Sequence, residues 1–369
     1  MTARVLHVLE AIEHGTSRHV IDVVTHATGI EHEVVVPPTR VGGLTDESAI
    51  GRMRDAGAQV HLLPMRRTPW APRNGESLAR LAALIRARRP SVVHGHSSIG
   101  GLLGRVAATA TRVPRFYTPN GVTDVKVGQL VERRLRRLTD RWVAVSASEG
   151  ELAVQRGFAD PRSLVVVPNG IPLEPPEPFD LHAHLGLERG VPLVGSIARL
   201  VAQKAPTDFV AACARIASVV PAARFVMIGG GQLQAEFDAA VESTGLRDRM
   251  FQLQSLPGAS AALPSFTVFM LTSRFEGGPY APLEAMRAGT PVVLTDVVGN
   301  RDVIESGVSG LLVPPGDPAA MATAVADLLG EPSRRASLAA AATARLHAQF
   351  DVRAMGARMA DLYRELSRA

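Results

Sequence analysis

Short apolar runs alternate with longer segments of helical periodicity along almost the whole chain. The apolar runs lie at residues 5–9, 33–36, 59–63, 91–94, 115–118, 141–145 and 164–167, and again at 193–197, 224–228, 250–253, 268–271, 291–294 and 310–313. Between them, apolar residues recur every three or four positions, for example at 18–28, 76–89, 205–219 and 318–329. Fully apolar strands that alternate with helices are typical of parallel sheets covered on both faces. We therefore predict an α/β fold with two Rossmann-like, doubly wound parallel-sheet domains in tandem.

A proline-rich interruption divides the two halves. Residues 168–192 hold four prolines between positions 172 and 178, several acids and no sustained period. We predict an N-terminal domain at 1–172, a linker at 173–190 and a C-terminal domain at 191–350, facing one another across a cleft. Open parallel sheets bind ligands at the carboxyl ends of their strands, so we expect the ligand there. Residues 351–369 predict a final helix that packs across the domain junction.

Composition narrows the class of protein. The chain has 369 residues, 46% apolar and 20% charged, which fits a large folded core and excludes a mainly disordered chain. No continuous apolar run reaches the length of a membrane-spanning helix, and the N-terminus lacks a signal peptide's apolar core. A single cysteine, Cys213, excludes an intramolecular disulfide. We expect a cytoplasmic protein.

The charge is uneven along the chain. Residues 1–175 carry 23 Lys and Arg against 16 Asp and Glu, whereas the remaining residues carry 17 against 19. An anionic membrane surface or a phosphorylated acceptor suits the basic half, and we expect no nucleic-acid partner. Residues 127, 130, 131, 135 and 138 form one apolar helical stripe beside several arginines. We interpret it as a core-packed helix, with peripheral docking on anionic lipid at the inner membrane face as the alternative.

The most specific motif runs from Ser273 to Met286. A strand ends near Ser273, a Gly277-Gly278-Pro279 turn comes next, and a helix opens with Leu283 and Glu284. Glycines permit close backbone approach to a ligand, and a helix N-terminus favours an anion. Glu276 and Glu284 both suit the predicted cleft, but each acid alone has a plainer interpretation, a solvated turn acid and a complement to the helix dipole.

In its wider context this motif resembles the family-4 glycosyltransferases of the GT-B architecture. Their signature is Glu-x7-Glu with Glu-Gly-x-Pro at its start, and residues 284–293, 298–304 and 307–317 match the family's helix, turn and strand on the C-terminal side of that signature. The resemblance covers nearly the whole chain. It implies that Glu276 holds donor-sugar hydroxyls and Glu284 holds the ribose hydroxyls of a nucleotide sugar.

Two cations follow the first strand of the second half. Arg199 and Lys204 lie between that strand and a helix, and the resemblance gives them the donor diphosphate. The chain contains no Asp-x-Asp, so fixed cations would take the charge that a metal neutralises elsewhere. We expect no metal and no cofactor beyond the nucleotide-sugar co-substrate. Ala205 stands where the family commonly has glycine, which we expect to alter the start of the next helix.

Three turns of the first half complete the predicted site. His94 and His96 end a strand at i and i+2 and so point the same way; the resemblance places His96 close to the donor sugar, with His94 supporting it. We disfavour a metal there because no further Cys, His or acid cluster adjoins. Asn120 replaces the histidine of a Thr-Pro-His-Gly motif; near the sugar it can still bond a hydroxyl but cannot exchange a proton near neutral pH. Gly15 follows His14 in a turn matched to the family's Gly-Gly loop. It would bring a backbone N–H to the donor phosphate or acceptor, with simple packing in a tight turn as the alternative.

The sequence therefore predicts a retaining, metal-independent hexosyltransferase that uses a nucleotide-diphosphate sugar, most simply a UDP sugar. We take Glu276, Arg199, Lys204 and His96 as its catalytic group. The acceptor is expected to be a lipid-linked or other glycan in exopolysaccharide or cell-envelope assembly. The alternatives are a small-molecule acceptor, a nucleotide-sugar 2-epimerase of the same fold, and a non-catalytic nucleotide-sugar sensor, which the departures at Asn120 and His14 would favour.

Overall fold

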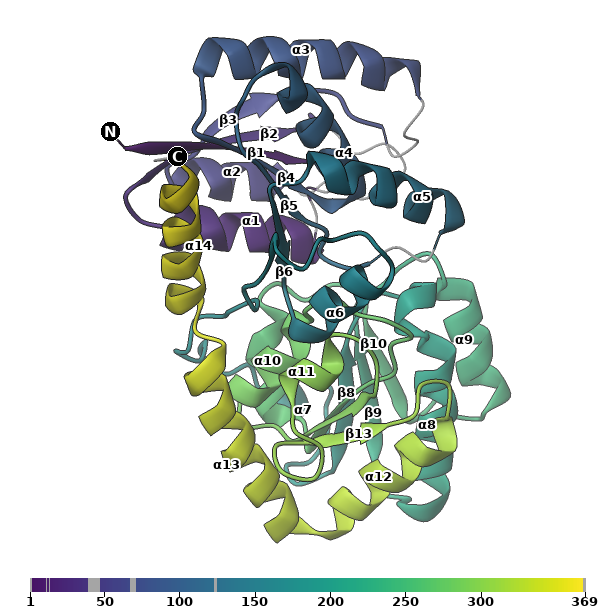
Figure 1. Cartoon of the computed structure of the whole chain (residues 1–369). Helices are drawn as coiled ribbons and strands as arrows, with labels where there is room; N and C mark the ends of the chain where they lie inside the picture. Colours follow the sequence, from purple (N-terminus) through teal and green to yellow (C-terminus); the bar gives the residue numbers. More distant parts are fainter. Residues whose placement is uncertain are drawn as a thin grey trace. The chain divides into compact units, whose positions relative to one another are not determined.

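The computed structural model describes residues 2–10, 12, 14–38, 47–66, 71–122 and 125–367. The chain divides into two units, Met1–Gly170 with Val352–Ala369, and Ile171–Asp351 (Figure 1). Each unit is a parallel sheet with helices on both faces. The predicted fold class, two Rossmann-like α/β domains, is confirmed.

In the first unit, the described residues form a sheet of seven parallel strands in the order β3-β2-β1-β4-β5-β6-β7. The strands are β1 (Ala3–Leu9), β2 (Ile30–Val36), β3 (Gln59–Leu62), β4 (Val92–His96), β5 (Arg115–Thr118), β6 (Arg141–Ala144) and β7 (Leu164–Val166). The helices are α1 (His14–His26), α2 (Glu47–Asp55), α3 (Pro72–Arg88), α4 (Ser97–Ala107), α5 (Lys126–Leu135), α6 (Ala147–Gln155) and α14 (Val352–Ser367), with short 3-10 turns η1 (Ala108–Ala110) and η2 (Arg136–Leu138).

Because side chains alternate between the two faces of a strand, the two faces of this sheet pack on different helices. Leu6 and Val8 of β1 pack with Leu81 of α3 and Leu103 of α4, whereas Val5 packs on the side of α1 and α14. Apolar residues are therefore buried on both faces, as a parallel sheet requires.

In the second unit, the described residues form a sheet of six parallel strands in the order β10-β9-β8-β11-β12-β13. The strands are β8 (Leu193–Ile197), β9 (Arg224–Ile228), β10 (Met250–Leu253), β11 (Val268–Leu271), β12 (Val292–Thr295) and β13 (Leu311–Val313). The helices are α7 (Leu181–His184), α8 (Pro206–Val219), α9 (Gln234–Ser243), α10 (Tyr280–Arg287), α11 (Asn300–Val303), α12 (Pro318–Gly330) and α13 (Pro332–Gln349), with 3-10 turns η3 (Ala202–Lys204) and η4 (Ala259–Ser265). One face packs on α8, α9 and α12, the other on α10, α13 and η4.

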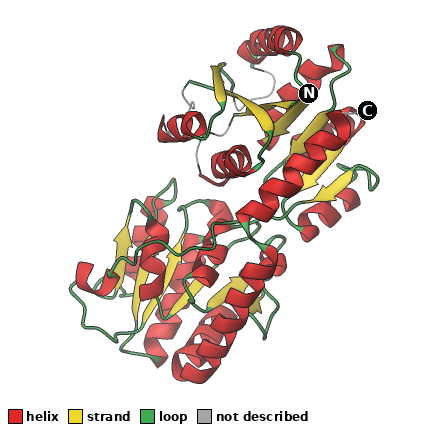
Figure 2. Ribbon diagram, turned by 90° about the vertical axis from the view of Figure 1, so that its left-hand side faces the viewer, coloured by secondary structure: helices red, strands yellow, loops and turns green. Residues whose placement is uncertain are grey.

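The division differs from the predicted boundaries in two places. The segment expected as a linker, 173–190, packs on the second unit: Leu181 is fully buried in its core, and the Phe179 N–H donates to the Ala261 carbonyl at 2.8 Å. Burial of its apolar side chains fixes this segment to the second unit, although its prolines are typical of a linker. The final helix, α14, belongs to the first unit, where it packs on α1, β1 and β4. In Figure 2 it is the helix that ends at the C label.

Candidate functional site

Two loops at the carboxyl edge of the second sheet bring a lysine and a glutamate together. One loop follows β8 and the other follows β11, and these strands are neighbours in the sheet. The Lys204 ammonium forms an ion pair with Glu276, and Ser273 Oγ donates a hydrogen bond to Glu276 Oε1 at 2.6 Å. Gln203 Nε2 donates to the Phe275 carbonyl at 3.0 Å and so ties the two loops together. Because Glu276 is only 6% exposed, it is not the solvated turn acid of the plainer interpretation.

The 277–279 turn leads directly into α10. An added Cβ on Gly299 would lie 2.6 Å from the Gly277 carbonyl oxygen, so the loop after β12 approaches this turn more closely than a side chain allows. Leu283 is buried in the core, and Glu284 is half-buried on the same helix. Glu284 therefore follows Glu276 on an ordered turn and helix, with part of its side chain accessible.

Arg199 lies between β8 and η3, on the loop that carries Lys204, and is half-buried. Ala205 ends this loop with φ 46° and ψ 60°. Thr272 Oγ1 donates to the carbonyls of Lys204 at 3.0 Å and Ala205 at 3.2 Å. The alanine thus holds, at the start of α8, the left-handed conformation that favours glycine.

In the first unit, the paired histidines of β4 point the same way, as their spacing predicts. The rings of His94 and His96 lie 4.0 Å apart between centroids. His94 Nδ1 lies 2.7 Å from the Tyr363 hydroxyl and its Nε2 2.9 Å from Thr118 Oγ1. Both histidines are fully buried, so a sugar hydroxyl would reach His96 only if the residues that cover it moved.

The expectation that no further histidine adjoins this pair is wrong. His7 of β1 stands in register with His94, and its Nδ1 lies 3.0 Å from His96 Nε2. His32 of β2 contacts His7 in turn, and the ring of His19 of α1 is tilted against that of His96, with 5.6 Å between their centroids. These residues are far apart in sequence, and only the strand order brings them together. Only the i, i+2 spacing of His94 and His96 was visible in the sequence, and no local pattern pointed to His7, His32 or His19.

Burial sets the protonation state of this histidine cluster. Loss of hydration lowers the pKa of His7, His94 and His96 well below the usual value, and their mutual repulsion as cations adds to the effect. Burial lowers the pKa of His19 to about 4, and it lowers that of His32 as well. The five imidazoles are therefore neutral near pH 7.

The other two predicted residues of the first unit differ in setting. Asn120 is half-buried with φ 55°, another left-handed residue at a strand end. The N–H of Gly121 beside it donates to Glu149 Oε1 at 2.6 Å, so this turn rests on a fully buried acid. The Ser146-x-x-Glu149 capping pattern was the signal for that acid. Gly15 is exposed in the first turn of α1; the His14 side chain lies outside the described residues.

The basic helix α5 is not core-packed along its predicted stripe, which corrects that interpretation. Leu135 is buried, but Val127 is 51% and Leu130 is 49% exposed, and Val125 just before the helix is 67% exposed. The helix is anchored instead by Glu132, which accepts from the fully buried Arg105 at 2.9 Å on both carboxylate oxygens.

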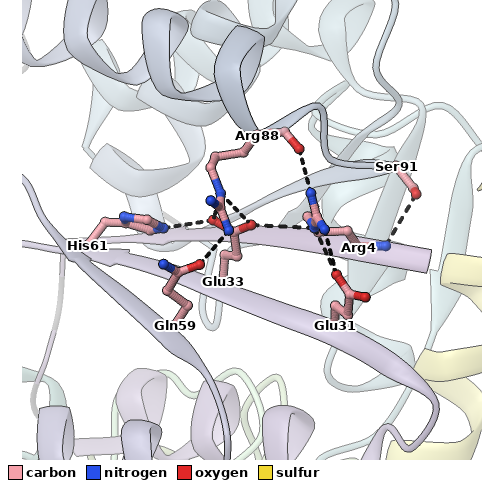
Figure 3. Close-up of polar contacts among 7 residues, drawn as sticks. All are labelled: Arg4, Glu31, Glu33, Gln59, His61, Arg88 and Ser91. Atoms are coloured by element: carbon pink, nitrogen blue, oxygen red, sulfur yellow. Dashed lines mark hydrogen bonds and ion pairs between the residues drawn. The ribbon is translucent and has the colours of Figure 1, made fainter. Parts of the chain in front are cut away.

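A second polar cluster lies on the opposite face of the first sheet. Glu33 of β2 accepts from Arg88 Nε at 2.9 Å and lies 2.7 Å from His61 Nε2, and Arg4 donates to Glu31 (Figure 3). These residues tie β1, β2, β3 and the end of α3 together. The cluster contains none of the predicted site residues.

Comparison with known proteins assigns both units to sugar transfer. Residues 179–345 match the family model of glycosyl transferases group 1, and residues 18–170 match that of a glycosyl transferase 4-like domain. A UDP-Gal:alpha-D-GlcNAc-diphosphoundecaprenol alpha-1,3-galactosyltransferase of Escherichia coli is 30% identical over 64% of this chain and 66% of its own length. A 2-deoxystreptamine N-acetyl-D-glucosaminyltransferase of Streptomyces fradiae is 31% identical over 74% of this chain and 70% of its own.

Solved structures show the same fold at low sequence identity. The crystal structure of Anabaena HepE in complex with UDP and glucose has a TM-score of 0.85 at 18% identity, over 98% of this chain and 100% of that one. Within the described residues, no helix combines the length and apolar character that a membrane span needs.

Proposed function

Because the chain belongs to the GT-B glycosyltransferases, as both family matches and the Streptomyces relative show, we propose that it transfers a hexose from a UDP sugar to an acceptor hydroxyl with retention of configuration. The contact of Lys204 with Glu276 carries this proposal. It joins a cation for a departing diphosphate to a carboxylate that can accept two sugar hydroxyls. The Anabaena neighbour's complex with UDP and glucose supports the choice of donor.

Four residues of the second unit and one turn act on the donor in this proposal. Arg199 and Lys204 neutralise the leaving diphosphate, so no metal ion is needed. Glu276 orients the sugar and Glu284 holds the ribose, while the 277–279 turn allows the donor to approach the backbone. The bond from the anomeric carbon to the phosphate oxygen breaks as the acceptor oxygen bonds to the same face. The departing phosphate oxygen takes the acceptor's proton, so no protein nucleophile takes part.

The ion pair gives Lys204 a second task before the donor arrives. Glu276 is nearly buried, and an unpaired buried carboxylate is costly. Lys204 therefore stabilises the empty loop pair and later shares its charge with the diphosphate, while Ser273 continues to hold the carboxylate. We assign no direct sugar contact to His96, because it is fully buried.

Lys204→Ala and Glu276→Ala test the site in a donor-turnover assay. Loss of one electrostatic partner of the transition state typically lowers kcat by about 100- to 1000-fold. The matched control is Arg247→Ala, which removes an exposed ion pair with Glu242 on the same unit and should leave turnover unchanged. Wild-type turnover in both site variants would refute the assignment. Activity that disappears with a chelator and returns with magnesium would refute metal independence, and NMR of the product's anomeric proton tests retention.

The acceptor is proposed to be a lipid-linked glycan of the cell envelope. The E. coli relative, named for a diphosphoundecaprenol-linked acceptor, supports this choice. The Streptomyces relative, named for 2-deoxystreptamine, supports a small-molecule acceptor as the second candidate. Parallel assays with a diphosphoundecaprenol-linked sugar and with 2-deoxystreptamine separate the two, because each assay contains only one of the candidate acceptors.

Helix α5 suits peripheral contact with an anionic membrane at its inner face. Val125, Val127 and Leu130 are exposed at its first turns, and exposed arginines at 133, 134, 136 and 137 follow. Apolar side chains beside basic ones are typical of helices that lie in the interface of an anionic bilayer. The buried Arg105–Glu132 pair holds the helix in place, so this surface is formed before any contact.

Flotation with phosphatidylglycerol vesicles tests this contact. We expect salt-sensitive binding that weakens about 5-fold for each cation removed in Arg134→Gln and Arg137→Gln, and that weakens further in Val127→Asn with Leu130→Asn. The control is Val219→Asn, which changes a comparably exposed valine of the second unit. Equal loss in the control, or binding that salt does not affect, would refute docking through α5.

A further inference from the structure

The histidine cluster of the first unit contains the donor set of a transition-metal site. His7, His94 and His96 each offer a ring nitrogen, and these three nitrogens lie within 4.8 Å of one another. Nitrogen ligands that share a metal at 2.0–2.1 Å lie about 3.3 Å apart, and His7 Nδ1 and His96 Nε2 are already 3.0 Å apart. The strands β1 and β4 carry all three residues on one face of the sheet.

A chain of hydrogen bonds fixes the position of each proton in the metal-free cluster. The Ala27 carbonyl can only accept, so the N–H of His32 is on Nε2, 3.2 Å from that oxygen. His32 Nδ1 then accepts from His7 Nε2 at 3.0 Å. His7 Nδ1 in turn accepts from His96 Nε2. The neutral His96 ring is left with a bare lone pair on Nδ1.

Neither this nitrogen lone pair nor one on His19 accepts a hydrogen bond from a described residue. His96 Nδ1 and His19 Nε2 are buried and make no hydrogen bond within the described part of the chain. His19 Nδ1 lies 2.9 Å from Asn169 Oδ1 and donates to it, so His19 Nε2 is an acceptor as well. The two rings are 5.6 Å apart, but two acceptors cannot satisfy one another. Buried nitrogens without partners are rare and need an explanation.

We propose that His7, His94 and His96 bind one divalent transition-metal ion, with Zn²⁺ as the reference ion. On binding, the His96 proton moves from Nε2 to Nδ1, Nε2 coordinates the metal, and Nδ1–H turns to His19 Nε2. No proton is gained or lost. The single shift gives both unpartnered nitrogens a hydrogen bond.

Every ligand then has a hydrogen-bond partner for its second nitrogen, which is the usual arrangement of metal-binding histidines. His7 keeps its Nε2–H bond to His32, and His32 keeps its bond to the Ala27 carbonyl. His94 coordinates through one nitrogen while the other donates to the hydroxyl beside it, that of Tyr363 or Thr118.

The ligand chemistry also selects the ion. Three imidazoles suit Zn²⁺, Co²⁺, Ni²⁺ or Cu²⁺, whereas Mg²⁺ and Ca²⁺ prefer oxygen ligands. The site lies within the first unit, while Lys204 and Glu276 belong to the second. Its role is structural, clamping β1 to β4, and it is compatible with sugar transfer that needs no metal.

The test is a titration of the metal-free full chain with Zn²⁺ by calorimetry, and with Co²⁺ by its absorption spectrum. We expect one equivalent bound and a Co²⁺ spectrum of nitrogen coordination. His7→Asn should weaken binding by more than about 100-fold, and His32→Phe, which removes only the partner of a ligand, by about 10- to 100-fold. His61→Asn is the matched control, because His61 lies on the other face of the sheet beside Glu33 (Figure 3).

Nitrogen-15 NMR of labelled histidine in the wild-type chain gives a readout that needs no variant. His96 should carry its proton on Nε2 without metal and on Nδ1 with Zn²⁺. Absence of a one-equivalent site in the wild type, equal binding in His7→Asn and His61→Asn, or an unchanged His96 tautomer at saturating Zn²⁺ would each overturn the proposal.

Discussion

Arg105→Met tests the anchor of α5. The Arg105 side chain is fully buried, and it pairs with Glu132, whose side chain is 8% exposed. Its Cζ lies 3.7 Å from the centroid of the Tyr117 ring, and its Nε donates to the Gly101 carbonyl at 2.8 Å. Removal of one partner of such a pair leaves a buried charge, which costs about 3–5 kcal/mol. We expect Arg105→Met to lower the free energy of unfolding of the first unit by that amount.

The assay is urea unfolding followed by tryptophan fluorescence, because Trp142 is buried in the first unit and the sequence of the second unit, Ile171–Asp351, contains no tryptophan. Glu132→Leu should cost a similar amount. The double variant should recover most of the loss, because well-packed apolar residues often replace a buried ion pair at little cost. Arg247→Met, at an exposed ion pair, should cost less than about 1 kcal/mol. An Arg105→Met loss below that of the control, or a double variant no more stable than the single ones, would refute the reasoning.

Three further predictions concern the backbone and the lone thiol. Ala205→Gly should change the free energy of unfolding by less than about 0.5 kcal/mol, because relief of the left-handed strain offsets the entropy cost of glycine. Ala211→Gly, inside α8, should cost about 1 kcal/mol. Urea unfolding midpoints compare the two variants, and an equal loss in both would contradict strain at Ala205. Gly100→Ala should prevent stable folding, because its Cβ would overlap the Val8 carbonyl oxygen, a backbone atom of β1. A thermal transition like that of the wild type would contradict this. Burial raises the pKa of the Cys213 thiol well above its usual value, so less thiolate is present at pH 8. A disulfide reagent should therefore modify Cys213 only after unfolding. Rapid modification of the native chain would contradict the burial of the thiol.

Periodicity predicted the fold because most strands of the two sheets carry apolar residues on both faces. Where a segment contains both prolines and apolar residues, its local pattern did not predict whether it packs on a domain. The 173–190 segment has the composition of a linker, but Phe179 and Leu181 bind it to the second unit. Likewise, the apolar positions of α14 predict a helix but do not name its partner, because an amphipathic stripe fits any apolar surface.

The candidate site, too, could be predicted from the sequence only in part. Glu276 and Lys204 were each predicted at the carboxyl edge of the second sheet. Their ion pair was not predicted, because β8 and β11 become neighbours only through the strand order of the sheet. The environment of His96 could not be predicted either, because His7 and His32 are single histidines in separate strands and become neighbours only through the sheet. For α5, an apolar stripe predicts burial on average, whereas the exposure of Val127 is decided by tertiary packing that the pattern does not contain.

The membership of α14 in the first unit has a consequence for biosynthesis. The ribosome completes residues 1–170 long before Val352 emerges, yet Tyr363 and Met359 fill the core against one face of that first sheet. Until the last helix is translated, this apolar face lacks the part of its cover that α14 supplies, and the nascent domain cannot reach its final stability. Chain termination shortly before α14 would therefore leave an intact second unit joined to an incompletely packed, aggregation-prone first unit.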